Sequence, residues 1–118
     1  MSNKNSFDAY QETAAETAVF PRKSQLETLM YLGLGLTGES GESAEKIKKL
    51  YRDYNGVITE EFRDNLIKEL GDIIWYASQI ALELGVNFSE VAERNIEKLQ
   101  SRMKQNKIQG SGDNRENQ

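Results

Sequence analysis

Residues 62–84 read FRDNLIKELGDIIWYASQIALEL, and this stretch decides the fold. Its apolar residues recur every three or four positions, which is the spacing of one face of an α-helix. The stripe consists of Phe62, Leu66, Leu70, Ile73, Ala77, Ile80 and Leu84, widened by Ile67, Ile74 and Ala81. Thr59 is a suitable N-cap and Gly85 a suitable C-terminal stop. We therefore expect a central amphipathic helix.

Three further helices are expected around it. The first covers roughly residues 5–18 and ends before Pro21, because the residue before a proline is disfavoured in a helix. The second runs from about Ser24 to Arg52. The fourth runs from an Asn87 cap, with Glu90 completing a capping box, to about Lys104. The prediction is an all-α fold, an antiparallel bundle of about four helices in one domain spanning residues 1–118.

The second helix combines an apolar stripe with four glycines. The stripe is formed by Leu26, Leu29, Leu36, Ala44, Ile47 and Tyr51. The glycines are Gly33, Gly35, Gly38 and Gly41, and each costs about 1 kcal/mol relative to alanine inside a helix. Either the helix breaks near residues 33–38, or glycine lets another helix or a ligand approach the backbone.

Composition excludes several kinds of chemistry. The chain has no histidine and no cysteine, which removes Ser-His-Asp and Cys-His catalysis and the usual zinc sites. The net charge is −4 with scattered Lys and Arg, so we expect no nucleic-acid polymer as partner. No apolar run approaches the ~18 residues of a membrane span, and the N-terminus leads into a polar helix, so a cytoplasmic location is expected. Residues from about 105 to 118 form a polar tail, either disordered or ordered only by a ligand or a neighbouring subunit.

Two acidic pairs are the candidate site. Glu39 with Glu42, and Glu69 with Asp72, are each spaced i, i+3, so each pair shares a helix face at the border of an apolar stripe. Two such helices facing each other would gather four carboxylates, the hard oxygen ligands that Mg²⁺ or Mn²⁺ prefers. The alternative is a non-catalytic helical interaction module in which these acids only solvate the surface.

Polar residues on the fourth helix offer a complementary site. Asn95, Lys98 and Arg102 lie in or beside its apolar stripe. They could bind phosphate oxygens, or they could be a satisfied buried amide and two cations that extend to solvent. Trp75 lies opposite the apolar stripe of its helix, where a subunit interface or a nucleobase could cover it. Tyr51, Tyr54 and Phe20 are further candidates for stacking on a base.

These motifs resemble those of the MazG-type nucleoside triphosphate pyrophosphohydrolases. The family pattern is a Glu doublet, two residues, a third Glu, a gap, and then Glu-x-x-Asp. Residues 36–47, LTGESGESAEKI, and 68–76, KELGDIIWY, follow it, although Gly38 replaces the first acid of the doublet. Asn95–Arg102 resembles the family's Asn-x-x-Lys-x-x-x-Arg segment, and residues 110–115 resemble its closing motif.

The resemblance implies Mg²⁺-dependent hydrolysis of (deoxy)nucleoside triphosphates to monophosphate and pyrophosphate. It implies Glu39, Glu42, Glu69 and Asp72 as metal ligands, with Mn²⁺ as a possible substitute. Glu39 or Glu42 would also orient or deprotonate the attacking water. The expected phosphate-binding residues are Asn95, Lys98, Arg102, Lys46 and Lys49. A homodimer or homotetramer with sites near its interfaces is implied. The dUTPase-like and dCTPase-like branches of the same superfamily use similar acids and remain alternatives.

Overall fold

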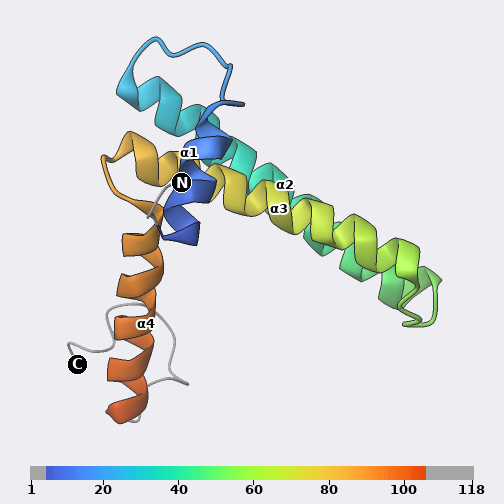
Figure 1. The fold of residues 1–118 in the computed structure, drawn as a ribbon. Coiled ribbons are helices and arrows are strands. Elements are labelled where there is room, and N and C mark those ends of the chain that lie inside the picture. The colour runs from blue at the N-terminus through green and yellow to red at the C-terminus, as the bar shows by residue number, and fades with distance from the viewer. Residues whose placement is uncertain (1–4, 106–118) are drawn as a thin grey trace.

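Four helices follow one another along residues 5–105, the part of the chain that the computed structural model describes, and no strand lies among these residues (Figure 1). Their bounds are α1 Ser6–Ala15, α2 Gln25–Asp53, α3 Glu60–Glu83 and α4 Phe88–Lys104. The all-α prediction and the four expected helices are confirmed. The predicted polar tail lies outside the described residues from residue 106 onward.

Most helix ends follow their local signals. The Ser24 and Thr59 hydroxyls accept hydrogen bonds from the backbone N–H groups of Glu27 and Phe62, both at 3.1 Å. Gly85, with φ +73°, follows the end of α3 in the left-handed conformation that glycine adopts without strain. The prediction for α1 is wrong at its end, because the helix stops at Ala15 and not near residue 18. There the Thr17 hydroxyl and backbone N–H both donate to the Ala14 carbonyl, which closes the chain into a turn.

Helices α2 and α3 form a long antiparallel pair joined by residues 54–59 (Figure 1). α2 runs unbroken through its glycines, so of the two alternatives that the glycines left open, a break near residues 33–38 does not occur. Its most buried residues are Thr28, Leu32 and Ser43, and Leu32 has no exposed surface. These differ from the predicted stripe, of which Leu26, Ala44, Ile47 and Tyr51 are exposed and Leu29 and Leu36 are half-buried. The most deeply buried side chains of α2 thus include two small polar ones, and most of the predicted apolar stripe is exposed.

Helix α4 leaves this pair at a steep angle, so antiparallel packing holds for α2 and α3 and does not extend to α4 (Figure 1). The predicted capping box is wrong, because Asn87 makes no side-chain cap bond. Asp8 of α1 caps the helix instead, accepting hydrogen bonds from the Ser89 N–H and hydroxyl, both at 2.8 Å. The sequence pattern missed this cap because Asp8 lies 81 positions away along the chain.

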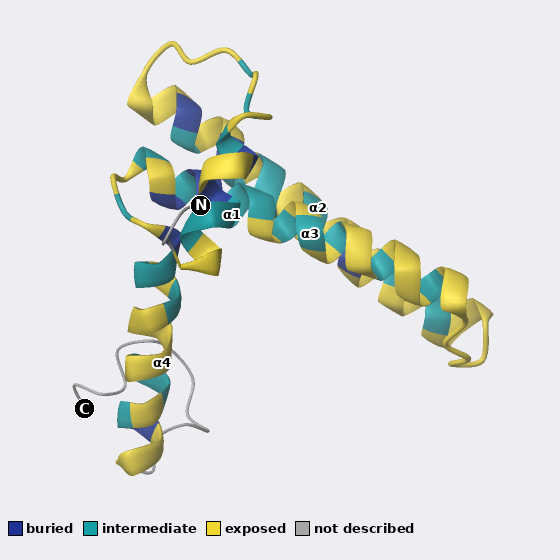
Figure 2. Ribbon diagram, viewed as in Figure 1, coloured by how far each residue is buried: buried dark blue, intermediate teal, exposed yellow. Residues whose placement is uncertain are grey.

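Among residues 5–105 the fully buried apolar residues are few: Ala14, Leu32, Ala81 and Phe88. Exposed residues run along the outer faces of the α2–α3 pair and along α4 (Figure 2). The radius of gyration is 17.3 Å, larger than the ~13 Å typical of a compact domain of this length. A single copy thus leaves much apolar surface in water. Within residues 5–105, no helix is both long and apolar enough to cross a membrane.

Candidate metal centre

The contact face of α2 carries Glu39 into the space between the two long helices. Leu32, Gly35, Glu39 and Ser43 recur at three- and four-residue intervals, so they share the face turned to α3. The ring of Tyr76 on α3 occupies the place where a side chain on Gly35 would stand. Gly35 therefore lets α3 come close to the backbone of α2. The other three glycines of α2 do not have this role, because a Cβ at Gly33, Gly38 or Gly41 would meet nothing within 4 Å.

Three of the four predicted acids meet here. Glu39 of α2 and Glu69 and Asp72 of α3 each offer one carboxylate oxygen, and these oxygens lie within 4.8 Å of one another. We call these three residues the acid cluster. Glu42, one turn further along α2, is exposed and does not belong to it. The i, i+3 spacing thus delivers both acids of α3 to one point but only one acid of α2.

The carboxylates of the acid cluster repel one another. The Oε2 atoms of Glu39 and Glu69 are buried, and neither accepts a hydrogen bond from the described residues. The facing Glu69 carboxyl group, with which Glu39 can share a hydrogen bond once one of the two is protonated, is the largest cause that raises the pKa of Glu39 from 4.5 to about 7. Burial adds to this shift, as do the negative charges of Glu42 and Asp72. A bound proton or metal ion would reduce the repulsion between these facing carboxylates.

One predicted phosphate-binding residue lies beside the cluster. The Lys46 ammonium is 3.8 Å from Oε1 of Glu69. Together with Lys49 it also borders a cavity of about 320 Å³ between the ends of α2 and α3. The rest of that lining is Leu50, Tyr54, Val57, Thr59, Glu61, Phe62 and Asn65. Lys46 therefore joins the acid cluster to a partly apolar cavity that has a second cation at its edge.

Two tyrosines that the sequence did not assign are influenced by the charges of the acid cluster. Burial first, and then Tyr31, Glu39 and Asp72, raise the pKa of Tyr76. Burial and the charge of Asp72 likewise raise the pKa of Tyr10 on α1. The sequence signal for Tyr76 was its position on the same helix edge as Glu69 and Asp72. Nothing local in the sequence pointed to Tyr10, which reaches the site because α1 packs against α3.

The aromatic residues that the sequence proposed for stacking on a base differ in their exposure and in their partners. Phe20 stacks on Tyr31 with ring centroids 4.6 Å apart, and the Arg22 guanidinium lies 4.7 Å from the Phe20 centroid. Trp75 is half-buried, not exposed as predicted, because its indole N–H donates to the Thr17 hydroxyl at 2.8 Å. Tyr51 is exposed, and Tyr54 is exposed at the edge of the cavity.

The α4 candidates are not brought to the acid cluster of the same chain. Asn95 is exposed, which corrects its expected place within a core stripe. Asn95 and Lys98 border a hollow with Ala81 and Leu84, at the C-terminal end of α3. Arg102 is only 3% exposed, so its guanidinium does not extend to solvent as one alternative expected.

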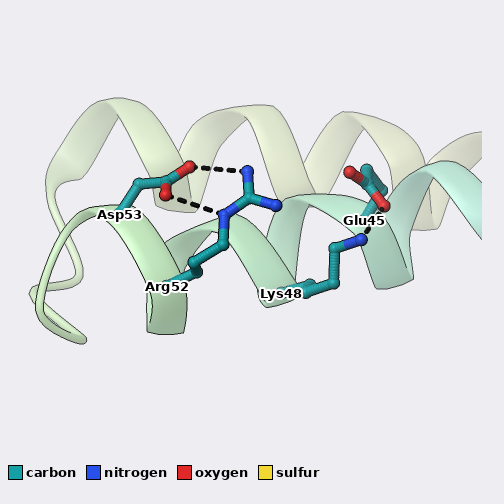
Figure 3. A network of polar contacts seen from close by, with 4 residues as sticks. All are labelled: Glu45, Lys48, Arg52 and Asp53. Carbon is teal, nitrogen blue, oxygen red and sulfur yellow. Dashed lines mark hydrogen bonds and ion pairs between the residues drawn. The ribbon is translucent and has the colours of Figure 1, made fainter.

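A further acid of α2, Glu45, has a purely surface role. Glu45 forms an ion pair with Lys48 at 3.1 Å, and the Arg52 guanidinium donates two hydrogen bonds of 2.8 Å to Asp53 (Figure 3). The hydrogen bond from Lys48 lowers the pKa of Glu45, the opposite of the shift at Glu39. Neighbouring acids of α2 thus differ because only one faces α3.

Comparison with known proteins places this geometry in a family. Residues 27–106 match the MazG nucleotide pyrophosphohydrolase domain, and this span contains α2 from its third residue, all of α3 and α4, and the acid cluster. The chain is also similar to the Gene 37 protein of Mycobacterium phage L5, with 51% identity over 111 residues, which is 92% of this chain and 97% of that protein. No solved structure gives a significant match. The chain belongs to the MazG nucleotide pyrophosphohydrolase domain family, whose members are generally dependent on divalent metals.

Proposed function

We propose that this chain hydrolyses ribo- or deoxyribonucleoside triphosphates to the monophosphate and pyrophosphate, with Mg²⁺ as cofactor and Mn²⁺ as a substitute. The observation that carries the proposal is the acid cluster, in which three carboxylates from facing helices meet and two of their oxygens are buried without a donor. Family membership supports a nucleotide as the substrate.

The donor set fits a hard divalent cation. Carboxylate oxygens are the ligands that Mg²⁺ takes, and it retains waters at its other positions. Glu39, Glu69 and Asp72 would hold it, because their oxygens already converge. When bound, Mg²⁺ neutralises phosphate charge and lowers the pKa of water in the site.

The remaining side chains have separate roles in the reaction. Water attacks the α-phosphorus, one P–O bond forms, and the bond to the pyrophosphate group breaks. Glu42, which is exposed and outside the cluster, orients this water and accepts its proton. Lys46 and Lys49, at the cavity beside the cluster, neutralise the distal phosphates. Asn95 and Lys98 of α4, which are not brought to the acid cluster of their own chain, would bind further phosphate oxygens at a site near a subunit interface.

We also propose that the working protein is a homodimer or homotetramer. The apolar stripe of α2, including Leu26, Ile47 and Tyr51, is exposed in a single copy. On α3, Ile67, Leu70 and Ile74 are exposed as well. Exposed apolar residues that recur along two packed helices are expected to be covered by a protein partner.

A product analysis tests the reaction. The chain is incubated with each NTP and dNTP plus Mg²⁺ in water labelled with oxygen-18, and the products are separated and weighed by mass spectrometry. We expect pyrophosphate and a labelled monophosphate. Release of orthophosphate, or label in the pyrophosphate, would contradict attack at the α-phosphorus. A non-catalytic module would instead turn over none of the nucleotides, and its melting temperature would not respond to Mg²⁺ plus nucleotide.

A further inference from the structure

Lys46 continues the face of α2 that lies against α3. It follows Glu39 by seven residues, about two helical turns, so the two side chains start from the same side of the helix. Ser43 lies between them and is buried, and its hydroxyl donates to the Glu39 carbonyl at 3.0 Å. Because helical side chains lean towards the N-terminus, the Lys46 stem leans back towards the acid cluster.

The ammonium of Lys46 reaches the acid cluster at Glu69 and balances its charge only in part. Its Nζ lies 3.8 Å from Oε1 of Glu69, which is within the range of an ion pair and beyond that of a hydrogen bond. Oε2 of Glu69 is buried and accepts no hydrogen bond from the described residues, and the same holds for Oε2 of Glu39. One loosely held ammonium thus faces three carboxylates.

The same ammonium also has a second place to lie. The Lys46 side chain is 38% exposed and that of Glu69 is 16% exposed, so the lysine is the more open member of the pair. Lys46 borders the cavity of about 320 Å³ between the ends of α2 and α3, where Lys49 is a second cation. Because a lysine has a flexible four-carbon stem, rotation about that stem would move the ammonium from the cluster into this cavity.

Mg²⁺ and the Lys46 ammonium would compete for the same carboxylate. Mg²⁺ binds carboxylate oxygens at about 2.0–2.1 Å, much closer than the 3.8 Å of the ion pair. It carries twice the charge of an ammonium and repels one at short range. Coordination of Mg²⁺ by Glu69 therefore favours release of Lys46 towards the cavity, on whose edge the article's proposed phosphate-binding lysines lie.

We propose that Lys46 occupies the metal position at Glu69 until Mg²⁺ binds, and that its ammonium then moves to the phosphates of the substrate. This inference rests on the proposed function, because it takes Mg²⁺ and a nucleoside triphosphate as the ligands. The exchange makes the two ligands cooperative, since Mg²⁺ takes Glu69 from Lys46 and the phosphates take Lys46 from Glu69. By linkage, each ligand raises the affinity for the other by the same factor.

Calorimetric titration with Mg²⁺ alone tests the exchange, at a pH of about 8 that lies above the pKa of about 7 of Glu39. Lys46→Gln should bind Mg²⁺ at least about threefold more tightly than wild type, because no ammonium has to be displaced. Lys46→Arg keeps a cation at this position and should bind Mg²⁺ about as wild type does. Binding by Lys46→Gln that is no tighter than that of wild type would overturn the proposal.

Lys49→Gln is the matched control, because it removes an equal charge from the same cavity without touching the ion pair with Glu69. It should strengthen Mg²⁺ binding much less than Lys46→Gln. Equal gains from the two substitutions would trace the effect to net charge and would contradict a specific exchange at Glu69.

A second titration measures the cooperativity with an α,β-imido nucleotide, added with and without Mg²⁺. The factor by which Mg²⁺ tightens nucleotide binding should be at least about threefold smaller in Lys46→Gln than in wild type. An equal factor in the two proteins would overturn the coupling through Lys46.

The same measurements distinguish failure of the exchange from failure of the proposed function. If wild type hydrolyses no nucleotide, while Lys46→Gln gains Mg²⁺ affinity as expected, the proposed function fails and the exchange is supported. If wild type releases pyrophosphate, while Lys46→Gln and wild type bind Mg²⁺ equally, the exchange fails and the proposed function stands.

Discussion

The ring of Tyr76 on α3 lies against the backbone of α2 at Gly35, in the volume that a side chain on Gly35 would fill. This contact brings the two helices close one turn before Glu39, and the charges of Glu39 and Asp72 help to raise the pKa of the same tyrosine. The separation of α2 and α3 at the acid cluster therefore depends on a residue that has no side chain. Substitution at Gly35 is expected to disturb the site without touching an acid.

Gly35→Ala is expected to destabilise the chain by about 1–3 kcal/mol, because the new methyl group forces the Tyr76 ring to move. Thermal or denaturant unfolding measures this change. Gly38→Ala is the matched control, since its methyl group would meet nothing within 4 Å, and the better helix propensity of alanine should raise stability by up to about 1 kcal/mol. Equal effects of the two substitutions would contradict a special packing role for Gly35.

Stability without metal should depend on pH through Glu39. Its pKa is raised in the folded state to about 7 from 4.5, so the folded chain binds this proton more tightly than the unfolded chain. The resulting stabilisation is complete below about pH 4.5 and is lost as pH rises through about 7. Melting curves in EDTA should show this decline, and Glu39→Gln should flatten it. Glu45→Gln, at an acid whose pKa is lowered, should leave the decline in place.

The stabilisation by bound Mg²⁺ should increase as pH rises, whereas the stability of the metal-free chain should decrease. Because Mg²⁺ competes with the proton on the cluster, the rise in melting temperature on adding Mg²⁺ should grow between about pH 6 and about pH 8. A rise that is independent of pH over this range would place the metal away from Glu39.

Glu69→Gln should reduce turnover by at least about a hundredfold while the fold persists, since even residues that only support a metal ligand typically cost ten- to a hundredfold. Circular dichroism and steady-state kinetics check the two halves of this prediction. Glu45→Gln removes the same charge from the exposed face of α2 and should retain turnover. A Glu69→Gln protein with unchanged turnover would remove Glu69 from the site.

Lys46→Ala should raise KM for the nucleotide more than it lowers kcat, because Lys46 borders the cavity beside the cluster and would meet the ground-state phosphates. Lys48→Ala is the control, since Lys48 pairs with Glu45 on the outer face of the same helix (Figure 3). If the two substitutions change KM equally, the effect reflects net charge and not a contact of Lys46.

Asp8→Ala should destabilise the chain by about 1–2 kcal/mol, because it removes both hydrogen bonds that cap α4 from α1. Asn87→Ala, at the position where local sequence placed the cap, should have a much smaller effect, because Asn87 makes no side-chain cap bond. Denaturant unfolding of the two variants compares them. The reverse order would show that the local cap dominates.

The local sequence was sufficient to predict the four helices and part of the candidate metal site. Apolar spacing and the Thr59 cap located α3, and the i, i+3 spacing of Glu69 and Asp72 was enough to aim both carboxylates at one point. These are interactions between residues within one turn, so they can be read from the chain directly. The acids also carried the resemblance that the family match bears out.

Tertiary structure decided which faces meet. α2 has an apolar stripe and, beside it, a face of small and polar residues, and helix periodicity alone favours the stripe as the contact. The face that contains Gly35 lies against α3, because the missing side chain leaves room for the Tyr76 ring. Glu39 therefore faces α3, while Glu42 and Glu45 are exposed. Asp8 and Gln11 set the direction of α4 through hydrogen bonds to residues more than 60 positions away. The sequence by itself therefore determined the helices and the chemistry they carry. Only packing between distant segments decided which acids converge and where the cations of α4 lie, because that depends on contacts no local pattern encodes.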